Sequence, residues 1–314
     1  MYTMDTNDQQ KLQLLELPDF SSTGEFASLL HIDEPFLLNL LKTPRSYYKI
    51  YTIPKSKGGF RVIQQPSSQL KGIQAWILRI ILDKIKPTPY ATAYRMGKNI
   101  KHNVNPHKSN DYFACLDLED FSPSISFNRV QKQFMRVGYS GNISRMLALI
   151  CTVSNQLPQG AVTSPSISNL IAVRLDKRIA GYTSKLNIAY TRYADDITLS
   201  CKNQDTLRHS LKRVFLIIKG EHFKPNMSKT RILGPGQRCE ITGLVKNNET
   251  NEFTIGRSQR RVVRSAMYRF INSSSKQYRY DSESKIEGWL NYLKGVDLTG
   301  YHSMLKYWDK LHRK

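Results

Sequence analysis

The chain has 314 residues, 40% of them hydrophobic, which suffices for one large domain or for two to three joined subdomains. It carries 47 Lys and Arg against 25 Asp and Glu, a formal net charge of +22. No run of 18 apolar residues occurs, and the polar start MYTMDTNDQQKLQ is unlike a secretory signal, so we expect a cytoplasmic protein without a membrane span. The charge predicts a polyanionic partner, and 17 tyrosines favour nucleic acid.

The N-terminal part of the sequence predicts short helices and then a hairpin. Residues 10–45 have helical spacing with breaks at Pro18 and Gly24. Two β-rich runs within 47–66 flank a Lys/Gly turn at 55–59, which is typical of a β-hairpin.

The middle of the sequence alternates predicted helices with apolar strands. A helix is expected over 67–85, a buried strand running into a turn over 111–125, and helical structure over 129–153. A Gly/Pro/Ser turn then feeds a long helix within 156–179, and a second hairpin follows at 189–201.

The C-terminal part of the sequence is predicted to end in basic helices. A helix around 205–219 and strands within 231–254 precede a helical and basic pattern from 257 onward. The run SSSK at 273–276 is typical of a linker, and the four cysteines show no CxxC pairing, so reduced thiols are expected. Helices interspersed with antiparallel strands indicate an α+β fold.

Two adjacent carboxylates, Asp195 and Asp196, stand at the tip of the second hairpin, where their charges repel. Such a pair persists when cations neutralise it, and hard oxygen ligands select Mg²⁺ or Mn²⁺. Asp117 ends the buried strand FACLD and is the best candidate for a third carboxylate. Together they predict a site for two metal ions that activates a hydroxyl and stabilises leaving pyrophosphate. The simpler alternative is that these aspartates are ordinary turn residues.

Three motifs occur in the order and spacing of the reverse-transcriptase palm: CLDLEDF (115–121), LPQGAVTSP (157–165) and YADD (193–196). More narrowly, the chain resembles bacterial retron reverse transcriptases. HNVNPH (102–107) is similar to the Asn-Ala-x-x-His element of that family, and ITGLV (241–245) is similar to its Val-Thr-Gly element.

The resemblance implies a right-hand polymerase with fingers, palm and thumb. We expect N-terminal helices and fingers over 1–110, and a palm over 111–255 that includes a helical segment at about 126–155. A basic helical thumb is expected over 256–314. Its Arg and Lys would hold backbone phosphates, while its Tyr and Trp are expected to form core.

The resemblance also implies a role for individual residues. The predicted catalytic residues and metal ligands are Asp117, Asp195 and Asp196, with Leu118 counted among the metal ligands. The predicted nucleotide-binding residues are Lys55, Arg61, Phe121, Ser122, Gln159, Gly160 and Lys229. The predicted RNA- or primer-binding residues are Asn103, His107, Tyr193, Thr242, Gly243, Arg260, Arg261 and Arg264.

The chain departs from the family pattern at a few positions. Val104 and Ile241 replace Ala and Val, and both changes are conservative. Ser122 stands where such enzymes usually carry an aromatic residue that excludes the ribose 2′-OH. Phe121 is the candidate to take over that role, and the alternative is weaker discrimination against ribonucleotides.

For function, the resemblance implies Mg²⁺-dependent, RNA-templated DNA synthesis from dNTPs. The enzyme would bind a cognate structured noncoding RNA, prime from a guanosine 2′-OH in it, and make branched RNA–DNA (msDNA). Such systems typically act in antiphage defence with an effector protein.

Three alternatives stay open at this point. One is another bacterial reverse transcriptase, of the group II intron or abortive-infection type. Another is an RNA-templated RNA polymerase. The Tyr-x-Asp-Asp motif argues against this alternative, whereas Ser122 is weak support for it. The third is a mainly RNA-binding scaffold that restrains an effector.

Overall fold

The computed structural model describes residues 6–55 and 58–312 and divides the chain into two compact units. The first consists of Met1–Pro89, Leu118–Arg178 and Ile217–Pro225, and the second of Tyr90–Asp117, Ile179–Leu216 and Asn226–Lys314. Each unit therefore combines distant stretches of sequence. The expected boundaries of fingers, palm and thumb stay a prediction.

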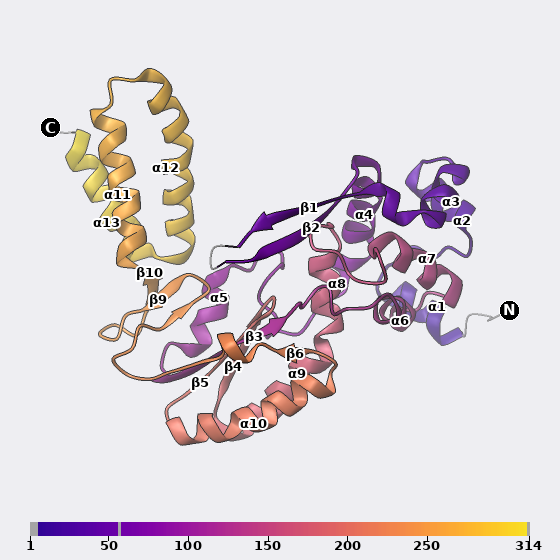
Figure 1. Ribbon diagram of the computed structural model, residues 1–314, viewed down its shortest axis with the longest axis horizontal. Helices are drawn as coiled ribbons and strands as arrows, with labels where there is room; N and C mark the ends of the chain where they lie inside the picture. Colours follow the sequence, from indigo (N-terminus) through magenta and orange to yellow (C-terminus); the bar gives the residue numbers. More distant parts are fainter. Residues whose placement is uncertain (1–5, 56–57, 313–314) are drawn as a thin grey trace. The chain divides into compact units, whose positions relative to one another are not determined.

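The first unit carries N-terminal helices and the β-hairpin expected at 47–66 (Figure 1). β1 (Tyr48–Pro54) pairs antiparallel with β2 (Phe60–Pro66). Gly58 and Gly59 of the turn have φ of +91° and +81°, a conformation that glycine adopts without strain, while Ser56 and Lys57 lie outside the described residues. The helices of this unit include α1 (Thr6–Leu14), α2 (Thr23–Leu30), α3 (Glu34–Lys42), α4 (Ser68–Ile80), α6 (Phe127–Val137), α7 (Gly141–Cys151) and α8 (Ser164–Ile171).

Several helix boundaries differ from the sequence prediction. Gly24 breaks no helix but lies in the first turn of α2, which begins after the N-cap Ser22. The expected helical stretch 129–153 is two helices, because Gly138 ends α6 with a φ of +122°. The long helix expected within 156–179 is likewise two helices, α8 and α9 (Val173–Thr183), separated at Ala172.

Five antiparallel strands form one sheet, in the order β4-β5-β3-β6 with β7 also paired to β3. Its strands are β3 (Tyr112–Glu119), β4 (Ala189–Tyr193), β5 (Asp196–Cys201), β6 (Lys224–Pro225) and β7 (Arg231–Leu233). The burial of β3 alternates over its second half, as expected for a strand with one face in the core. α10 (Gln204–Gly220) follows β5, so helices and antiparallel strands alternate as the α+β prediction requires.

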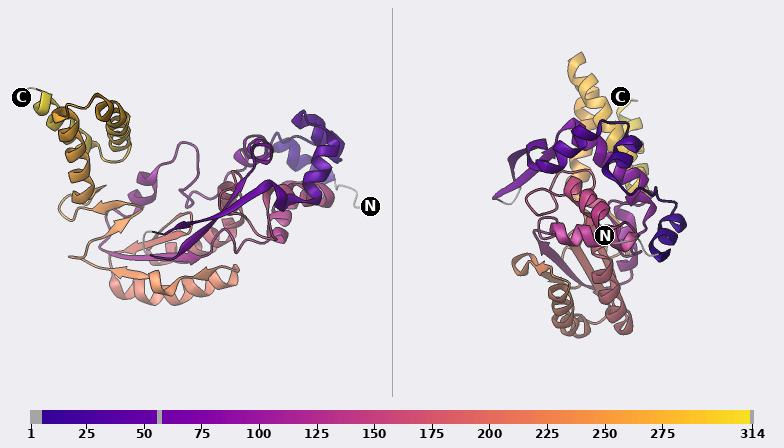
Figure 2. Two further views of the ribbon diagram at one scale, coloured as in Figure 1. Left: turned by 45° about the horizontal axis from the view of Figure 1, so that its top comes forward. Right: turned by 90° about the vertical axis from the view of Figure 1, so that its right-hand side faces the viewer.

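The second unit ends in three helices that pack on one another, α11 (Arg257–Asn272), α12 (Lys276–Val296) and α13 (Leu298–His312), as Figures 1 and 2 show. They follow a small sheet of β8 (Glu240–Ile241), β9 (Leu244–Lys246) and β10 (Phe253–Ile255), linked to α5 (Ile100–Val104) by a shared core. Trp289, Tyr301, Tyr307 and Trp308 pack against that core, which confirms that these aromatic residues are structural.

Two further features concern the cysteines and the hydrophobicity of the helices. All four cysteines are free, and Cys151, Cys201 and Cys239 are buried. Over the described ranges, no helix combines the length and apolar character that a membrane crossing needs.

A buried carboxylate ties the C-terminal helices to the small sheet. Asp297 has a side chain that is 1% exposed and accepts hydrogen bonds from the backbone N–H of Ile255 and of Gly300, at 3.1 and 2.8 Å. It also pairs with Arg260, whose Nη2 lies 3.2 Å from Oδ2. One side chain thereby joins the end of β10, the start of α11 and the start of α13.

We expect Asp297→Ala to lower the free energy of unfolding by about 3 kcal/mol, because it leaves the partly exposed guanidinium of Arg260 and two backbone donors without their buried acceptor. Thermal and urea denaturation measure the change. Asp309→Ala, at an exposed position of α13, is the matched control and should stay within about 0.5 kcal/mol of wild type. Equal stability of the two variants would contradict the assigned role of Asp297.

Candidate active site

Strand pairing brings the three predicted catalytic carboxylates to one end of β3, β4 and β5. Asp117 lies directly opposite Asp196 in the antiparallel ladder, and Tyr193 lies opposite Asp196 on the other side. Directly opposed residues have Cβ atoms about 5 Å apart, so two acidic side chains here must interact. Asp195 is the turn residue beside them, and it follows Ala194, whose φ is +58°.

The neighbouring carboxylates raise the proton affinity of Asp196. Loss of hydration, together with repulsion from Asp195 and Asp117, raises the pKa of Asp196 to about 6. Because Asp196 keeps an exposed surface, we attribute more of the effect to repulsion than to burial. Lys229 and Arg231 act in the opposite direction.

Lys229 is a cation in direct contact with this cluster. Its Nζ donates to Oδ1 of Asp117 at 2.8 Å, and this hydrogen bond raises the pKa of the Lys229 ammonium group. Asn226 positions the lysine, because its side chain accepts from the backbone N–H of Lys229 while its own backbone N–H donates to the carbonyl of Asp117. The Asn-x-x-Lys spacing of the sequence thus corresponds to a short turn that holds lysine against carboxylate.

The chemical type of these donors, carboxylate oxygen, is the type that a hard divalent cation prefers. Three carboxylates share one end of the sheet, and one of them has a raised pKa. A bound cation would reduce the repulsion between them. As arranged within the described ranges, no three His, Cys, Asp or Glu side chains converge closely enough to form a metal site, and Lys229 provides the positive charge at Asp117. Leu118 belongs to the other compact unit, and its place among the ligands stays a prediction.

In the first unit, the predicted nucleotide-binding loop touches the hairpin. The backbone N–H of Gln64 in β2 donates to the carbonyl of Gln159 at 2.8 Å. Gly160 has a φ of +126°, and a Cβ there would lie 2.9 Å from the carbonyl oxygen of Gln64. Glycine is therefore required both for the backbone conformation and for this close approach. Lys55 and Arg61 of the same hairpin are exposed.

Phe121 and Ser122 follow β3, and their side chains differ in exposure. Phe121 is 5% exposed, and its ring lies 5.3 Å from that of Phe223. Ser122 is half-buried in the turn. Phe121 as the residue that excludes the ribose 2′-OH stays a prediction.

Asn103 and His107, the residues of the retron-like element, are buried rather than presented to solvent. Asn103 accepts from Thr92 and donates to Thr242, at 3.0 and 3.4 Å. His107 contacts hydroxyl groups of β4 and β5. Thr242 and Gly243, with φ of +47° and +82°, form the tight turn between β8 and β9.

The three predicted RNA-binding arginines of α11 have different environments. Arg260 is turned inward to Asp297. Arg264 is exposed, donates to Ser303 and lies 5.4 Å from the ring centre of Tyr307. Arg261 is exposed. Exposure therefore favours Arg261 and Arg264 over Arg260 as phosphate ligands.

One supporting residue of the catalytic hairpin went unnoticed in the sequence. Arg192 is fully buried, and its Nη1 donates to the carbonyl of Ala194 at 3.0 Å, within the turn that carries Asp195. The available signal was an arginine inside the otherwise apolar strand AYTRY, since a buried charge needs hydrogen-bond partners.

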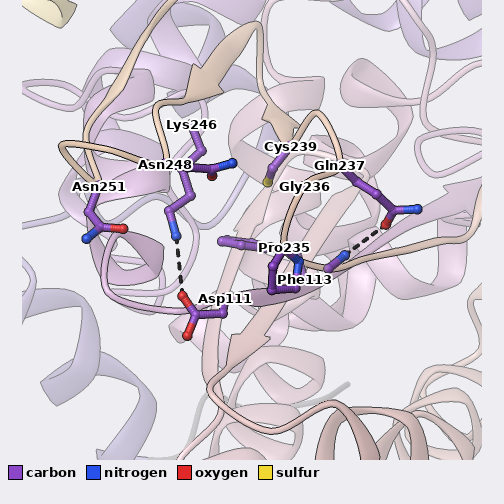
Figure 3. A pocket seen from close by; sticks show the side chains of 10 residues that line it. Asp111, Phe113, Pro235, Gly236, Gln237, Cys239, Lys246, Asn248 and Asn251 are labelled. Atoms are coloured by element: carbon purple, nitrogen blue, oxygen red, sulfur yellow. Dashed lines mark hydrogen bonds and ion pairs between the residues drawn. The ribbon is translucent and has the colours of Figure 1, made fainter.

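A polar pocket of about 320 Å³ lies beside β3 and β9 and contains none of the catalytic candidates (Figure 3). The Lys246 side chain, 4% exposed, extends over the ring of Phe113 and toward Asp111, with Nζ 3.9 Å from Oδ1. Burial lowers the pKa of the Lys246 ammonium group. Lys246 therefore already has an ion-pair partner, Asp111, and an aromatic partner, Phe113, among the residues that line the pocket.

Comparison with known proteins agrees with this geometry. The chain is 35% identical over 306 residues to the retron Ec86 reverse transcriptase of Escherichia coli, covering 97% of this chain and 93% of the relative. It is 28% identical to the retron Mx65 reverse transcriptase of Myxococcus xanthus, over 91% of this chain and 71% of that protein.

A solved structure supports the fold. A telomerase from Candida albicans in complex with a fragment of telomeric RNA superposes with a TM-score of 0.52 at 12% identity, covering 83% of this chain and 55% of that one.

Residues 53–280 match the reverse transcriptase (RNA-dependent DNA polymerase) family. The chain therefore belongs to the reverse transcriptases, and within them to those of retrons.

Proposed function

We propose that this RNA-directed DNA polymerase uses a cognate structured noncoding RNA as template and primes from a 2′-OH within it. The product would be branched RNA–DNA (msDNA), made in the cytoplasm, and the enzyme would serve antiphage defence together with an effector protein. The observation that carries the proposal is the opposition of Asp117 and Asp196, beside Asp195, in a chain so similar to a retron reverse transcriptase.

Each carboxylate has a distinct part in this proposal. Asp117 and Asp195 would hold two Mg²⁺ ions, for which Mn²⁺ can substitute, and Asp196 would set the charge of the site. When bound, the metals supply Lewis-acid stabilisation of the attacking and leaving oxygens. Lys229, which pairs with Asp117, would donate a proton to the departing pyrophosphate.

The remaining predicted residues would bind the nucleotide and the nucleic acid. Lys55 and Arg61 are exposed cations suited to charge-assisted hydrogen bonds with a triphosphate. The Gln159–Gly160 turn, fixed against β2, offers a flat backbone surface for the incoming base. Tyr193 and the turn at Thr242 and Gly243 would face the primer.

Extraction of the bound nucleic acid tests the proposal directly. The gene is expressed with its native flanking DNA, and nucleic acid purified with the protein is treated with RNase and with debranching enzyme. We expect short single-stranded DNA whose mobility changes after each treatment, and none with Asp195→Asn/Asp196→Asn. Bound RNA without DNA in both samples would contradict the proposal and favour a scaffold. Efficiency of plating of phages, with and without the neighbouring gene, tests the defence role separately.

The role of Lys229 predicts a specific kinetic defect. Lys229→Gln should lower the single-turnover rate of nucleotide addition by about 10²-fold, because general-acid catalysis typically contributes at least this factor. Template–primer affinity should change little. Lys224→Gln is the matched control, since Lys224 of β6 forms a comparable pair with Glu119 of β3. Equal rates for the two variants would exclude Lys229 as proton donor.

The raised pKa of Asp196 predicts opposite pH effects with and without metal. In the metal-free protein, the stabilisation from protonating Asp196 is complete below about pH 4 and is lost as the pH rises through about 6. Asp196→Asn should therefore raise the melting temperature more at pH 7.5 than at pH 5.

Added Mg²⁺ should stabilise the wild type more at pH 7.5 than at pH 5, because protons compete with the metal for the carboxylate. Thermal denaturation in EDTA or MgCl₂ measures both effects, with Asp309→Asn as the control for general charge removal. A pH-independent difference between wild type and Asp196→Asn would show that the carboxylate is not perturbed.

A further inference from the structure

The imidazole of His107 bridges β4 and β5, the two strands of the catalytic hairpin. Its Nε2 lies 2.8 Å from Thr191 Oγ1 in β4, and its Nδ1 lies 2.6 Å from Ser200 Oγ in β5. All three side chains are buried, with at most 3% exposed. Thr191 is opposite Thr198 and Ser200 is opposite Ala189, so the histidine reaches diagonally across the ladder.

The neighbouring groups determine where the protons lie. The hydroxyl of Thr191 donates to the backbone carbonyl of Asn103 at 3.1 Å, so its oxygen can only accept from the histidine. Nε2 of His107 must then carry the proton, and Nδ1 must accept from the hydroxyl of Ser200. Ser200 in turn accepts from the side-chain amide of Asn110 at 2.8 Å. Every donor in this chain meets an acceptor.

Protonation would break this order, because both ring nitrogens would then be donors. Burial opposes that event, and it lowers the pKa of His107 to about 3. The imidazole is therefore neutral throughout the pH range in which a polymerase works.

The same segment also holds the backbone of β4. The backbone N–H of Arg192 donates to the carbonyl of Tyr90, and the carbonyl of Arg192 accepts from the backbone N–H of Thr92, both at 2.9 Å. Asn103 continues the connection, because it bonds both Thr92 and Thr242 of the β8–β9 turn. Residues 90–110 thus hold β4, the strand that leads into Asp195, by several hydrogen bonds.

We infer that His107 is a positioning residue for DNA synthesis, which holds β4 and β5 in the register that presents Asp195 and Asp196, and is not a ligand of RNA. The inference rests on the proposed catalytic role of those two aspartates. Its physical basis is that a displacement of about 1 Å at a reacting group can cost 10²-fold in rate. A fully buried imidazole with both nitrogens engaged has no group left to offer to RNA.

The test compares binding with turnover on poly(rA)·oligo(dT), dTTP and Mg²⁺. We expect His107→Leu to lower kcat by at least 10-fold, with KM for dTTP and Kd for the template–primer within twofold of wild type. His107→Gln keeps a donor for Thr191 and should recover part of kcat. His209→Leu, at an exposed position of α10, is the matched control and should behave as wild type.

Two milder variants decide the matter if His107→Leu does not fold. Thr191→Val and Ser200→Ala each remove one bond of the bridge and should each lower kcat about 3-fold or more. In the wild type, ¹⁵N chemical shifts of labelled histidine should show one buried imidazole protonated on Nε2 alone and unchanged between pH 5.5 and 8.

The outcomes separate the inference from the function on which it rests. Activity retained by Asp195→Asn would overturn the catalytic assignment itself. Loss of activity in Asp195→Asn with unchanged kcat in Thr191→Val and Ser200→Ala would overturn the positioning role alone. A rise in Kd of the His107 variants with unchanged kcat would instead make His107 part of the nucleic-acid site.

Discussion

Mutual repulsion of three carboxylates at one end of a sheet is the constraint on which the rest of this structure depends. Asp117 and Asp196 are placed opposite each other by the ladder itself, so neither can move away without breaking strand pairing. The charge must be balanced from outside, and Lys229 does so for Asp117. A polymerase can use this arrangement, because repulsion between carboxylates raises the free energy of a metal-free site, and binding of cations then stabilises the protein by a larger amount.

Such a site needs a rigid support, and the support is polar as well as apolar. Arg192 holds the turn through the carbonyl of Ala194, and His107 joins the two strands. Hydrogen bonds of this kind are directional, unlike apolar contacts, so they can fix a register that a hydrophobic core alone would leave adjustable. These bonds are made on β4, on β5 and on the turn between them, the segment that carries Asp195 and Asp196.

The sequence predicted those parts of the fold whose signals are local. Both hairpins were predictable, because alternating apolar residues and special turn residues are adjacent in sequence, and the acidic cluster followed from motif spacing. The separation of α8 from α9 at Ala172 has no Gly or Pro to mark it. The burial of His107 was not predictable from local sequence, because its partners are 84 and 93 residues away.

The same distinction between local and distant signals bears on the charge of the chain. A count of +22 treats every cation alike, yet Arg260 is paired with Asp297, 37 residues away, and Lys246 is buried over Phe113. Cations satisfied inside the protein release no counterions on binding nucleic acid, so they add nothing to salt-dependent affinity. The exposed Arg261 and Arg264 remain available to phosphates. Internal pairs such as Arg260–Asp297 instead join the start of α11, the helix that carries Arg261 and Arg264, to the start of α13.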